Sequence, residues 1–250
     1  MQTFVTLVRR ELGAFFVSLT GYAVMAGVLF LLGLSMTLML NSLDATPVAV
    51  PVIELFYETA FFWLILLLAA PVITMRSFAL ERASGTYETL MTTPVSDLEV
   101  VLAKFTGNLI FFLIIWLPFL AYPFILRRYT AEPDAVATGP LSTTFLGIFL
   151  LGCLYMSMGI FASSITRNQI LAAMNAFAMG LCLFFLSFVS NMVPLGDGWL
   201  SKIAAHLSMF EHMRDFVQGV IDTRHITFYL SLTALFLYLT LKVVESRRWK

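Results

Sequence analysis

Six stretches of about 20 mostly apolar residues run through this chain of 250 residues and leave no room for a separate soluble domain. The stretches lie near residues 17–40, 56–75, 105–126, 142–165, 169–190 and 226–243. Charged residues make up only 12% of the chain, against about a quarter in typical soluble domains. The sequence therefore predicts an all-α integral membrane protein in which residues 1–250 form a single transmembrane domain with six spans.

An even number of spans puts both termini on the same side of the membrane, and the basic residues indicate which side that is. The side with the termini carries ten Lys and Arg residues: Arg9, Arg10, Arg76, Arg82, Lys104, Arg167, Lys242, Arg247, Arg248 and Lys250. The opposite side carries five: Arg127, Arg128, Lys202, Arg214 and Arg224. Because cytoplasmic loops carry an excess of Lys and Arg, we expect both termini to be cytoplasmic.

Two amphipathic segments lie outside the spans. From Phe4 to Phe16, apolar residues alternate with polar ones at helical spacing and predict an interfacial helix along the inner leaflet. From Trp199 to Ile221, apolar residues recur at steps of three and four. This second pattern predicts an amphipathic helix, or a pair of helices, at the outer surface.

The fourth and fifth spans are separated only by Thr166–Gln169, which predicts a tight helical hairpin. Gly159 and Ser163 form a small-xxx-small pair on the fourth span, a pattern that permits close approach of a neighbouring helix. Cys153 and Cys182 both fall inside apolar stretches, and we interpret them as small buried apolar residues.

The sequence lacks the motifs of common catalytic and metal sites. It has no Gly-x-x-x-x-Gly-Lys-Ser/Thr motif, so it carries no P-loop ATPase, and it has no His-Glu-x-x-His, Gly-x-Ser-x-Gly or Cys-x-x-Cys motif. His206, His212 and His225 all fall outside the predicted spans, and we predict no metal site among them. The formal net charge is zero, so nothing indicates binding to nucleic acid.

No ionisable side chain is predicted to lie deep in a span, although proton- and ion-driven transporters usually keep one there. Glu54 and Glu58 come nearest, four residues apart on one face at the outer end of the second span. They are candidates for an outer vestibule that attracts a cationic group, and the alternative is that they are solvated residues at a helix start. The energy for any uphill transport must therefore come from a partner.

The segment between the second and third spans is short, amphipathic and helix-like. Its sequence from Thr74 to Ser96 resembles the signature that ABC-2 type transporter permeases carry between their second and third spans. The stretches 159–169 and 219–224 are similar to the same family. Together the three stretches look most like the permease subunit of its gliding-motility-associated branch, and the resemblance covers essentially the whole chain.

The resemblance implies a six-span half-transporter of the type V exporter class, with an elbow helix, a cytoplasmic coupling helix and outer re-entrant or interfacial helices. The chain would be the permease subunit of an ATP-driven exporter in a bacterial inner membrane. Two copies of a separate ATP-binding subunit would bind ATP and Mg²⁺, and this chain would hold no cofactor. A second permease would complete the transporter, either a related chain with an outer domain or another copy of this chain.

Within the segment from Arg76 to Pro94, the residue types indicate a surface that another protein moves. Glu81 and Glu88 are two helical turns apart and therefore share a face, while Phe78 offers apolar area for docking into a groove. Pro94 would end this helix before the next one starts at Asp97. The candidate coupling residues are Phe78, Glu81, Gly85, Thr86, Glu88, Leu90, Pro94, Arg167 and Asn168. The alternative is a solvated helix that merely connects two spans.

The cargo and a rival function remain open at this point. Spans rich in Phe, Leu and Met without buried charges suit a lipidic, glycan or other bulky substrate better than a small ion. The rival is a structural membrane subunit of a larger envelope or motility assembly that transports nothing. An intramembrane enzyme would need converging titratable groups, which the predicted spans lack.

Overall fold

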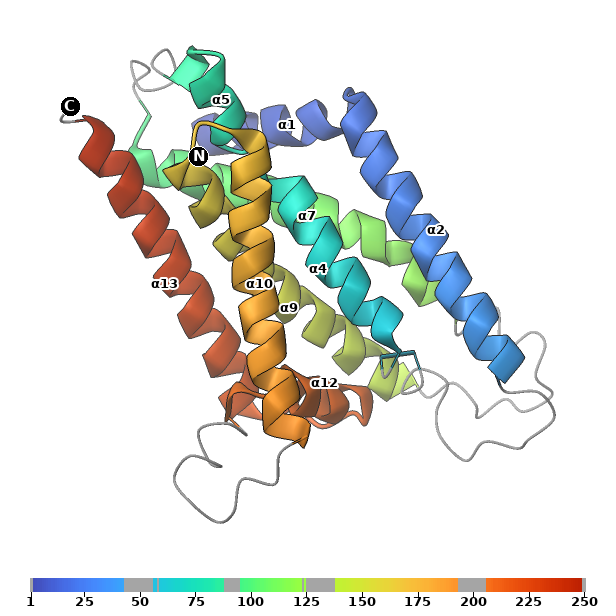
Figure 1. The fold of residues 1–250 in the computed structure, drawn as a ribbon. Coiled ribbons are helices and arrows are strands. Elements are labelled where there is room, and N and C mark those ends of the chain that lie inside the picture. The colour runs from blue at the N-terminus through green and yellow to red at the C-terminus, as the bar shows by residue number, and fades with distance from the viewer. Residues whose placement is uncertain are drawn as a thin grey trace.

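The computed structural model describes residues 2–42, 56–57, 59–87, 95–122, 124, 138–192 and 206–248, and these residues form a bundle of helices (Figure 1). Six of its helical segments are long and apolar enough to cross a membrane. Five of them are the helices α2 (Leu19–Ser42), α7 (Asp97–Trp116), α9 (Thr138–Ile165), α10 (Gln169–Met192) and α13 (Thr223–Arg248). The sixth, Ala60–Ala83, consists of α4 (Ala60–Thr74) and the residues that follow it. The predicted all-α fold with six spans is confirmed.

Four further helices have bounds within the described residues. They are α1 (Gln2–Phe16), α5 (Ala79–Ala83), the 3₁₀ helix η1 (Leu117–Leu120) and α12 (Met209–Val217). Both termini, α1 and α5 lie at one end of the bundle, which we call the terminal end, and α12 lies at the opposite end (Figure 1). Both termini lie at the same end, as an even number of spans predicts.

The first predicted amphipathic helix is present as α1, and the second is present in part as α12. Helix α1 runs across the terminal end and packs on α7, where the rings of Phe15 and Phe111 stack with centroids 4.3 Å apart. Helix α12 covers the middle of the predicted outer helix and buries one face, which includes Met213 and Phe216. Residues 199–205 of that prediction lie outside the described residues.

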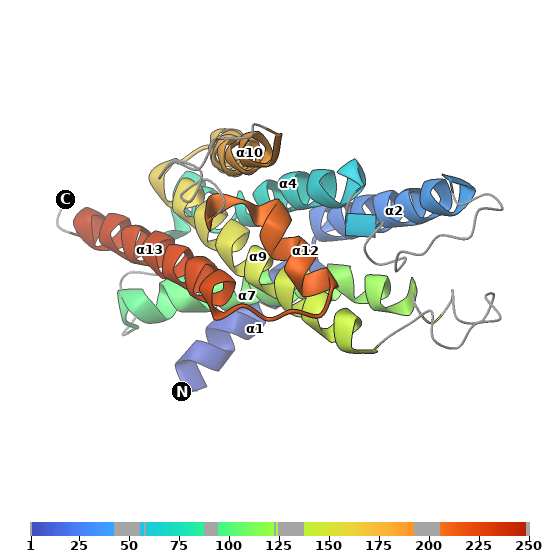
Figure 2. The ribbon, with the colours of Figure 1, turned by 90° about the horizontal axis from the view of Figure 1, so that it is seen from below.

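Helix α9 occupies the centre of the bundle. It packs against α4, α7, α10, α12 and α13, and it is the most buried of the six long helices (Figure 2). In helices α2, α10 and α13, most residues are exposed or only partly buried. Those apolar faces are available to lipid or to other membrane chains, because lipid tails solvate apolar side chains as well as a protein core does.

The predicted close approach at Gly159 is confirmed. An added Cβ at Gly159 of α9 would lie 2.7 Å from the Cβ of Thr74 in α4, well inside contact distance. Thr74 is fully buried, and its hydroxyl donates a 2.8 Å hydrogen bond to the carbonyl of Ala70, so its side chain has little freedom to move aside. The glycine therefore sets the distance between α4 and α9.

We expect Gly159→Ala to lower the free energy of unfolding by about 1–3 kcal/mol, because an overpacked core must shift its helices. The measurement is a thermal or denaturant unfolding curve in detergent micelles. Gly33→Ala is the matched control, since an added Cβ on Gly33 of α2 meets no atom within 4 Å. Equal midpoints for the two variants would contradict the role of Gly159.

The third long helix begins at Asp97, as predicted from Pro94, but the predicted span boundary near residue 105 is wrong. Ser96 and Glu99 form a capping box in which the Ser96 hydroxyl accepts a 3.3 Å bond from the Glu99 amide. Lys104, which we expected to lie outside the span because of its charge, lies within α7 and is only 2% exposed. A buried ammonium needs negative partners, and Lys104 has them in the carboxylates of Glu11 and Glu81.

The prediction for the two cysteines is half right. Cys153 of α9 is buried, as expected, whereas Cys182 of α10 is exposed. The difference follows from the position of the helices, because α9 is covered by neighbours on several sides and α10 leaves one face uncovered.

Candidate functional site

The predicted coupling segment begins where α4 ends. Residues 75–78 form a turn, α5 follows, and Gly85 has a positive φ of 75° in the turn after α5. We call residues 75–87 the α5 segment. The candidate residues Glu88, Leu90 and Pro94, and the candidate vestibule residues Glu54 and Glu58, lie outside the described residues.

A serine of α9 holds the start of α5. The buried Ser163 hydroxyl accepts hydrogen bonds from the amides of Phe78 (3.0 Å) and Ala79 (3.1 Å) and donates one to the Met75 carbonyl (3.1 Å). Amides in the first turn of a helix have no partner inside the helix, so an external acceptor stabilises them. The guanidinium of Arg82 also donates to the Ser164 carbonyl. Helix α5 is therefore fastened to α9 at its start and near its end.

Four charged side chains fasten the same segment to α1 and α7. The Lys104 ammonium donates to Glu81 Oε1 (2.8 Å) and to Glu11 Oε1 (3.0 Å). Arg10 donates to the same two carboxylate oxygens, at 3.1 Å for Glu81 and 2.8 Å for Glu11. We call these four residues the charge cluster. Its two positive and two negative charges balance, which permits a lysine to be buried.

The electrostatics of the charge cluster keep Glu11 ionised near neutral pH. Burial by itself raises the pKa of Glu11, but the interactions with Lys104 and Arg10 outweigh it and bring the pKa below its ordinary value. The Lys104 ammonium also lies 5.1 Å from the ring centroid of Phe78. At neutral pH the Glu11 carboxylate is therefore charged beside Lys104 and Arg10.

Two of the predicted coupling residues point into the protein. Phe78 is 0% exposed and packs with Val100, Val101, Ile160 and Val244, so the prediction that its ring docks into a partner's groove is wrong. Glu81 turns toward Lys104 and Arg10 and does not present its carboxylate to solvent. Both side chains hold the segment in place because the capping serine and the buried lysine lie on that side of α5.

The exposed part of the segment is its tip, residues 83–86, which includes the candidates Gly85 and Thr86. The candidates Arg167 and Asn168 are also exposed, in the short connection between α9 and α10, and the Asn168 side chain accepts a 2.9 Å bond from the Ile170 amide. Helix α5 contacts both α9 and α10. The fold thus brings the two predicted stretches together at the terminal end.

A family model described as ABC-2 family transporter protein matches residues 15–241, from the end of α1 into α13. The chain belongs to this family. No curated protein matches it. Members of the family are membrane transport subunits that are generally not catalytic themselves and normally pair with an ATP-binding subunit. The chain is accordingly a multi-pass membrane protein with the helices of an ABC-2 permease.

Sequence reasoning missed several residues that position the α5 segment of this ABC-2 permease. They include Arg10 and Glu11 of α1, Lys104 and Asn108 of α7, and the capping function of Ser163. One signal was present: Lys104 and Asn108 are four residues apart and therefore share a helix face. Asn108 donates a 2.7 Å hydrogen bond to the buried Ser77 hydroxyl, so this polar face of α7 meets the start of the segment.

At its α12 end, the permease buries His212, one of the three histidines that fall outside the predicted spans. His212 is 1% exposed, and its ring centroid lies 4.0 Å from that of His225, which bonds Asp215 at 2.8 Å. Burial first, and then His225, lower the pKa of His212 to about 3. Among the described residues, no three His, Cys, Asp or Glu side chains are grouped to bind a metal.

Proposed function

We propose that this chain is the permease subunit of an ATP-driven exporter and that its α5 segment receives motion from an ATP-binding partner. One observation supports this role most directly. Hydrogen bonds to Ser163 join the segment to α9, and the ion pairs of the charge cluster join it to α1 and α7. Its tip is nevertheless exposed. A partner that displaces the tip therefore displaces three helices with it.

The proposal requires that the nucleotide states of the partner bind the tip with different free energies, because a ligand shifts a conformational equilibrium only by its differential affinity. We place the terminal end in the cytoplasm, since it carries the larger share of the Lys and Arg residues. Two copies of the partner would bind ATP and Mg²⁺ there. A second permease, related or identical, would complete the transporter in a bacterial inner membrane, as in the type V exporter class.

We further propose a lipidic, glycan or other bulky cargo. The apolar faces that α2, α10 and α13 leave uncovered support this proposal, because an amphipathic substrate could reach them through the bilayer. The resemblance to the gliding-motility-associated branch supports a partner permease with an outer domain. The second candidate, a structural subunit of an envelope or motility assembly, has the same helices but predicts no stimulation of an ATPase.

The test is a substitution at the tip that leaves its fastening intact. We expect Ala83→Trp to lower the ATPase rate of the reconstituted complex about tenfold, within the range of typical coupling free energies, because the bulky ring obstructs the partner. The assay uses the permease with the ATP-binding subunit that copurifies with it. Val220→Trp is the matched control, because Val220 is 51% exposed and lies near α12 at the other end.

Two outcomes would contradict the proposal. One is an assembled Ala83→Trp complex with the ATPase rate and transport of the unmodified protein. The other is an ATPase that turns over at the same rate with and without the permease, which would favour a structural subunit.

A further inference from the structure

An apolar groove lies between α2 and α4, and at its terminal end lies Arg76, which has no carboxylate partner among the described residues. We propose that this groove holds one acyl chain of a glycerophospholipid and that Arg76 binds its phosphate. The proposal concerns a lipid held within one permease chain. It does not require that this lipid be the cargo.

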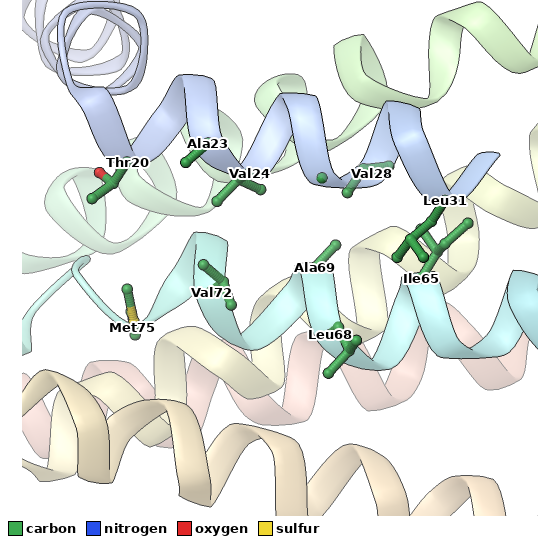
Figure 3. Close-up of a pocket in the computed structure, with 11 residues that line it drawn as sticks. Thr20, Ala23, Val24, Val28, Leu31, Ile65, Leu68, Ala69, Val72 and Met75 are labelled. Atoms are coloured by element: carbon green, nitrogen blue, oxygen red, sulfur yellow. The ribbon is translucent and has the colours of Figure 1, made fainter. Parts of the chain in front are cut away.

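The groove has the size and lining of a hydrocarbon site. Its volume is about 360 Å³, within the roughly 300–1,000 Å³ typical of ligand pockets. Short side chains, among them Ala23 and Val24 of α2 and Ala69 and Val72 of α4, face each other across it (Figure 3). Except for the hydroxyl of Thr20, every side chain that lines the groove is apolar. A polar ligand would find almost no hydrogen-bond partner in the groove. An acyl chain would exchange contacts with lipid tails for similar apolar contacts with the protein.

The polar end of the groove is built around Arg76. Thr20 and Met75 lie at the end of the groove nearest α1 (Figure 3), and Arg76 follows Met75 in the α5 segment. The Arg76 guanidinium donates to the hydroxyls of Ser18 (2.8 Å) and Thr20. The headgroup end of a lipid in the groove would therefore lie beside this guanidinium.

The charge on Arg76 is not balanced in the described part of the chain. No carboxylate of the described residues lies within 4.0 Å of it, whereas Arg10 and Lys104 each contact both Glu11 and Glu81. Hydroxyls are neutral acceptors, so they satisfy hydrogen bonds of the guanidinium without neutralising it. A phosphate would do both, because the planar guanidinium matches phosphate geometry.

A second hollow of about 250 Å³ lies beside the first at the same end, and Arg76 lines it together with the charge cluster and Asn108. It provides room for a polar headgroup next to the phosphate. The apolar groove is too small for a transmembrane helix, whose diameter with side chains is about 10–12 Å. A glycerophospholipid fits this arrangement. Its acyl chain would lie in the apolar groove, its phosphate beside Arg76 and its headgroup in the second hollow.

The test measures lipid binding to the full chain by native mass spectrometry, after the purified protein has been delipidated in detergent. The probes are dioleoylphosphatidylglycerol, dioleoylglycerol with the same chains and no phosphate, and inorganic phosphate alone. We expect one phosphatidylglycerol to bind at least tenfold more tightly than either of the other probes. Comparable binding of dioleoylglycerol would overturn the role of Arg76.

Two substitutions test the two halves of the site. Arg76→Gln keeps a donor for Ser18 but removes the charge, and we expect it to weaken phosphatidylglycerol binding about tenfold, with partial recovery in Arg76→Lys. Gly27→Leu fills the groove without a clash, because an added Cβ on Gly27 meets no atom within 4 Å, and we expect a similar loss. The matched controls are Gly33→Leu on the same helix and Arg9→Gln on the exposed face of α1, which should bind as the unmodified protein does.

Unchanged phosphatidylglycerol binding in Arg76→Gln or in Gly27→Leu would overturn the proposal. An equal loss in Gly33→Leu would do the same, since it would indicate a general effect of leucine on α2. Binding that disappears when the second permease and the ATP-binding subunit are present would show that a protein covers the groove, and it would also overturn the proposal. Because the assay contains no ATP and measures no transport, its failure is separate from failure of the proposed exporter function.

Discussion

The Lys104→Ala variant is expected to lose about 3–5 kcal/mol of unfolding free energy, the cost typical of breaking a buried ion pair from one side. Lys104 is 2% exposed, and its ammonium lies 3.0 Å from Glu11 Oε1 and 2.8 Å from Glu81 Oε1. Without Lys104, the partly buried carboxylates of Glu11 and Glu81 have Arg10 as their one remaining cationic partner in the cluster. The Arg10 side chain is 49% exposed. The folded state must then carry an excess negative charge between α1, α5 and α7.

The measurement is a denaturant unfolding curve in detergent micelles at neutral pH. Lys242→Ala is the control, since Lys242 and Glu245 form an exposed pair whose removal should leave the midpoint unchanged. Adding Glu11→Gln and Glu81→Gln to Lys104→Ala should restore much of the lost stability, because the uncompensated charges are then gone. If Lys104→Ala cost no more than Lys242→Ala, the charge cluster would not stabilise the fold.

Acid is expected to destabilise the protein through His212, well above the pH at which carboxylates titrate. The folded protein holds the pKa of His212 at about 3, against an ordinary 6.5, because the ring is buried and lies beside His225. Between these two values the unfolded chain binds more protons than the folded one, so stability is complete above pH 6.5 and falls as the pH falls. The loss is about 2 kcal/mol at pH 5 and about 3 kcal/mol at pH 4, since each pKa unit corresponds to about 1.4 kcal/mol.

The experiment compares unfolding free energies from pH 7.5 to pH 5. His212→Asn should flatten the pH dependence in this window, even if it lowers the stability at pH 7.5. His206→Gln, at an exposed histidine, should keep the slope of the unmodified protein. Glu11 does not interfere, because its pKa lies below its ordinary value of 4.5 and its stabilising charge is lost only in more acidic solution. A His212→Asn variant with an unchanged slope would refute the assignment.

Local sequence features predicted the helices and most of their ends. Apolar length identified six spans, because a helix that crosses a bilayer needs about 20 apolar residues whatever its neighbours are. The start of α7 at Asp97 was predicted from Pro94, and the capping box that Ser96 and Glu99 form there is equally local in the chain. The hairpin at Thr166–Gln169 followed from the short polar break between two spans, and α9 ends and α10 begins there.

The sequence predicted a candidate segment, but it did not predict how the side chains of that segment are oriented. The sequence identified the segment around α5, and the exposure of Gly85 and Thr86 agrees with a surface for a partner. It could not show that Phe78 is buried or that Glu81 turns inward. Those orientations depend on residues far along the chain. Ser163 lies 85 positions from Phe78, and Lys104 lies 23 positions from Glu81.

The sequence alone determined that this chain is a six-span, all-helical membrane protein, because hydrophobic length, capping and turns are properties of neighbouring residues. Only the tertiary structure decided which charges compensate each other and where a groove remains open. The ion pair between Lys104 and Glu11 joins residues 93 positions apart, and the groove beside Arg76 depends on the spacing of two helices. Interactions of this kind form only when distant segments pack, since each charge is stable inside the protein only beside a partner that the fold supplies.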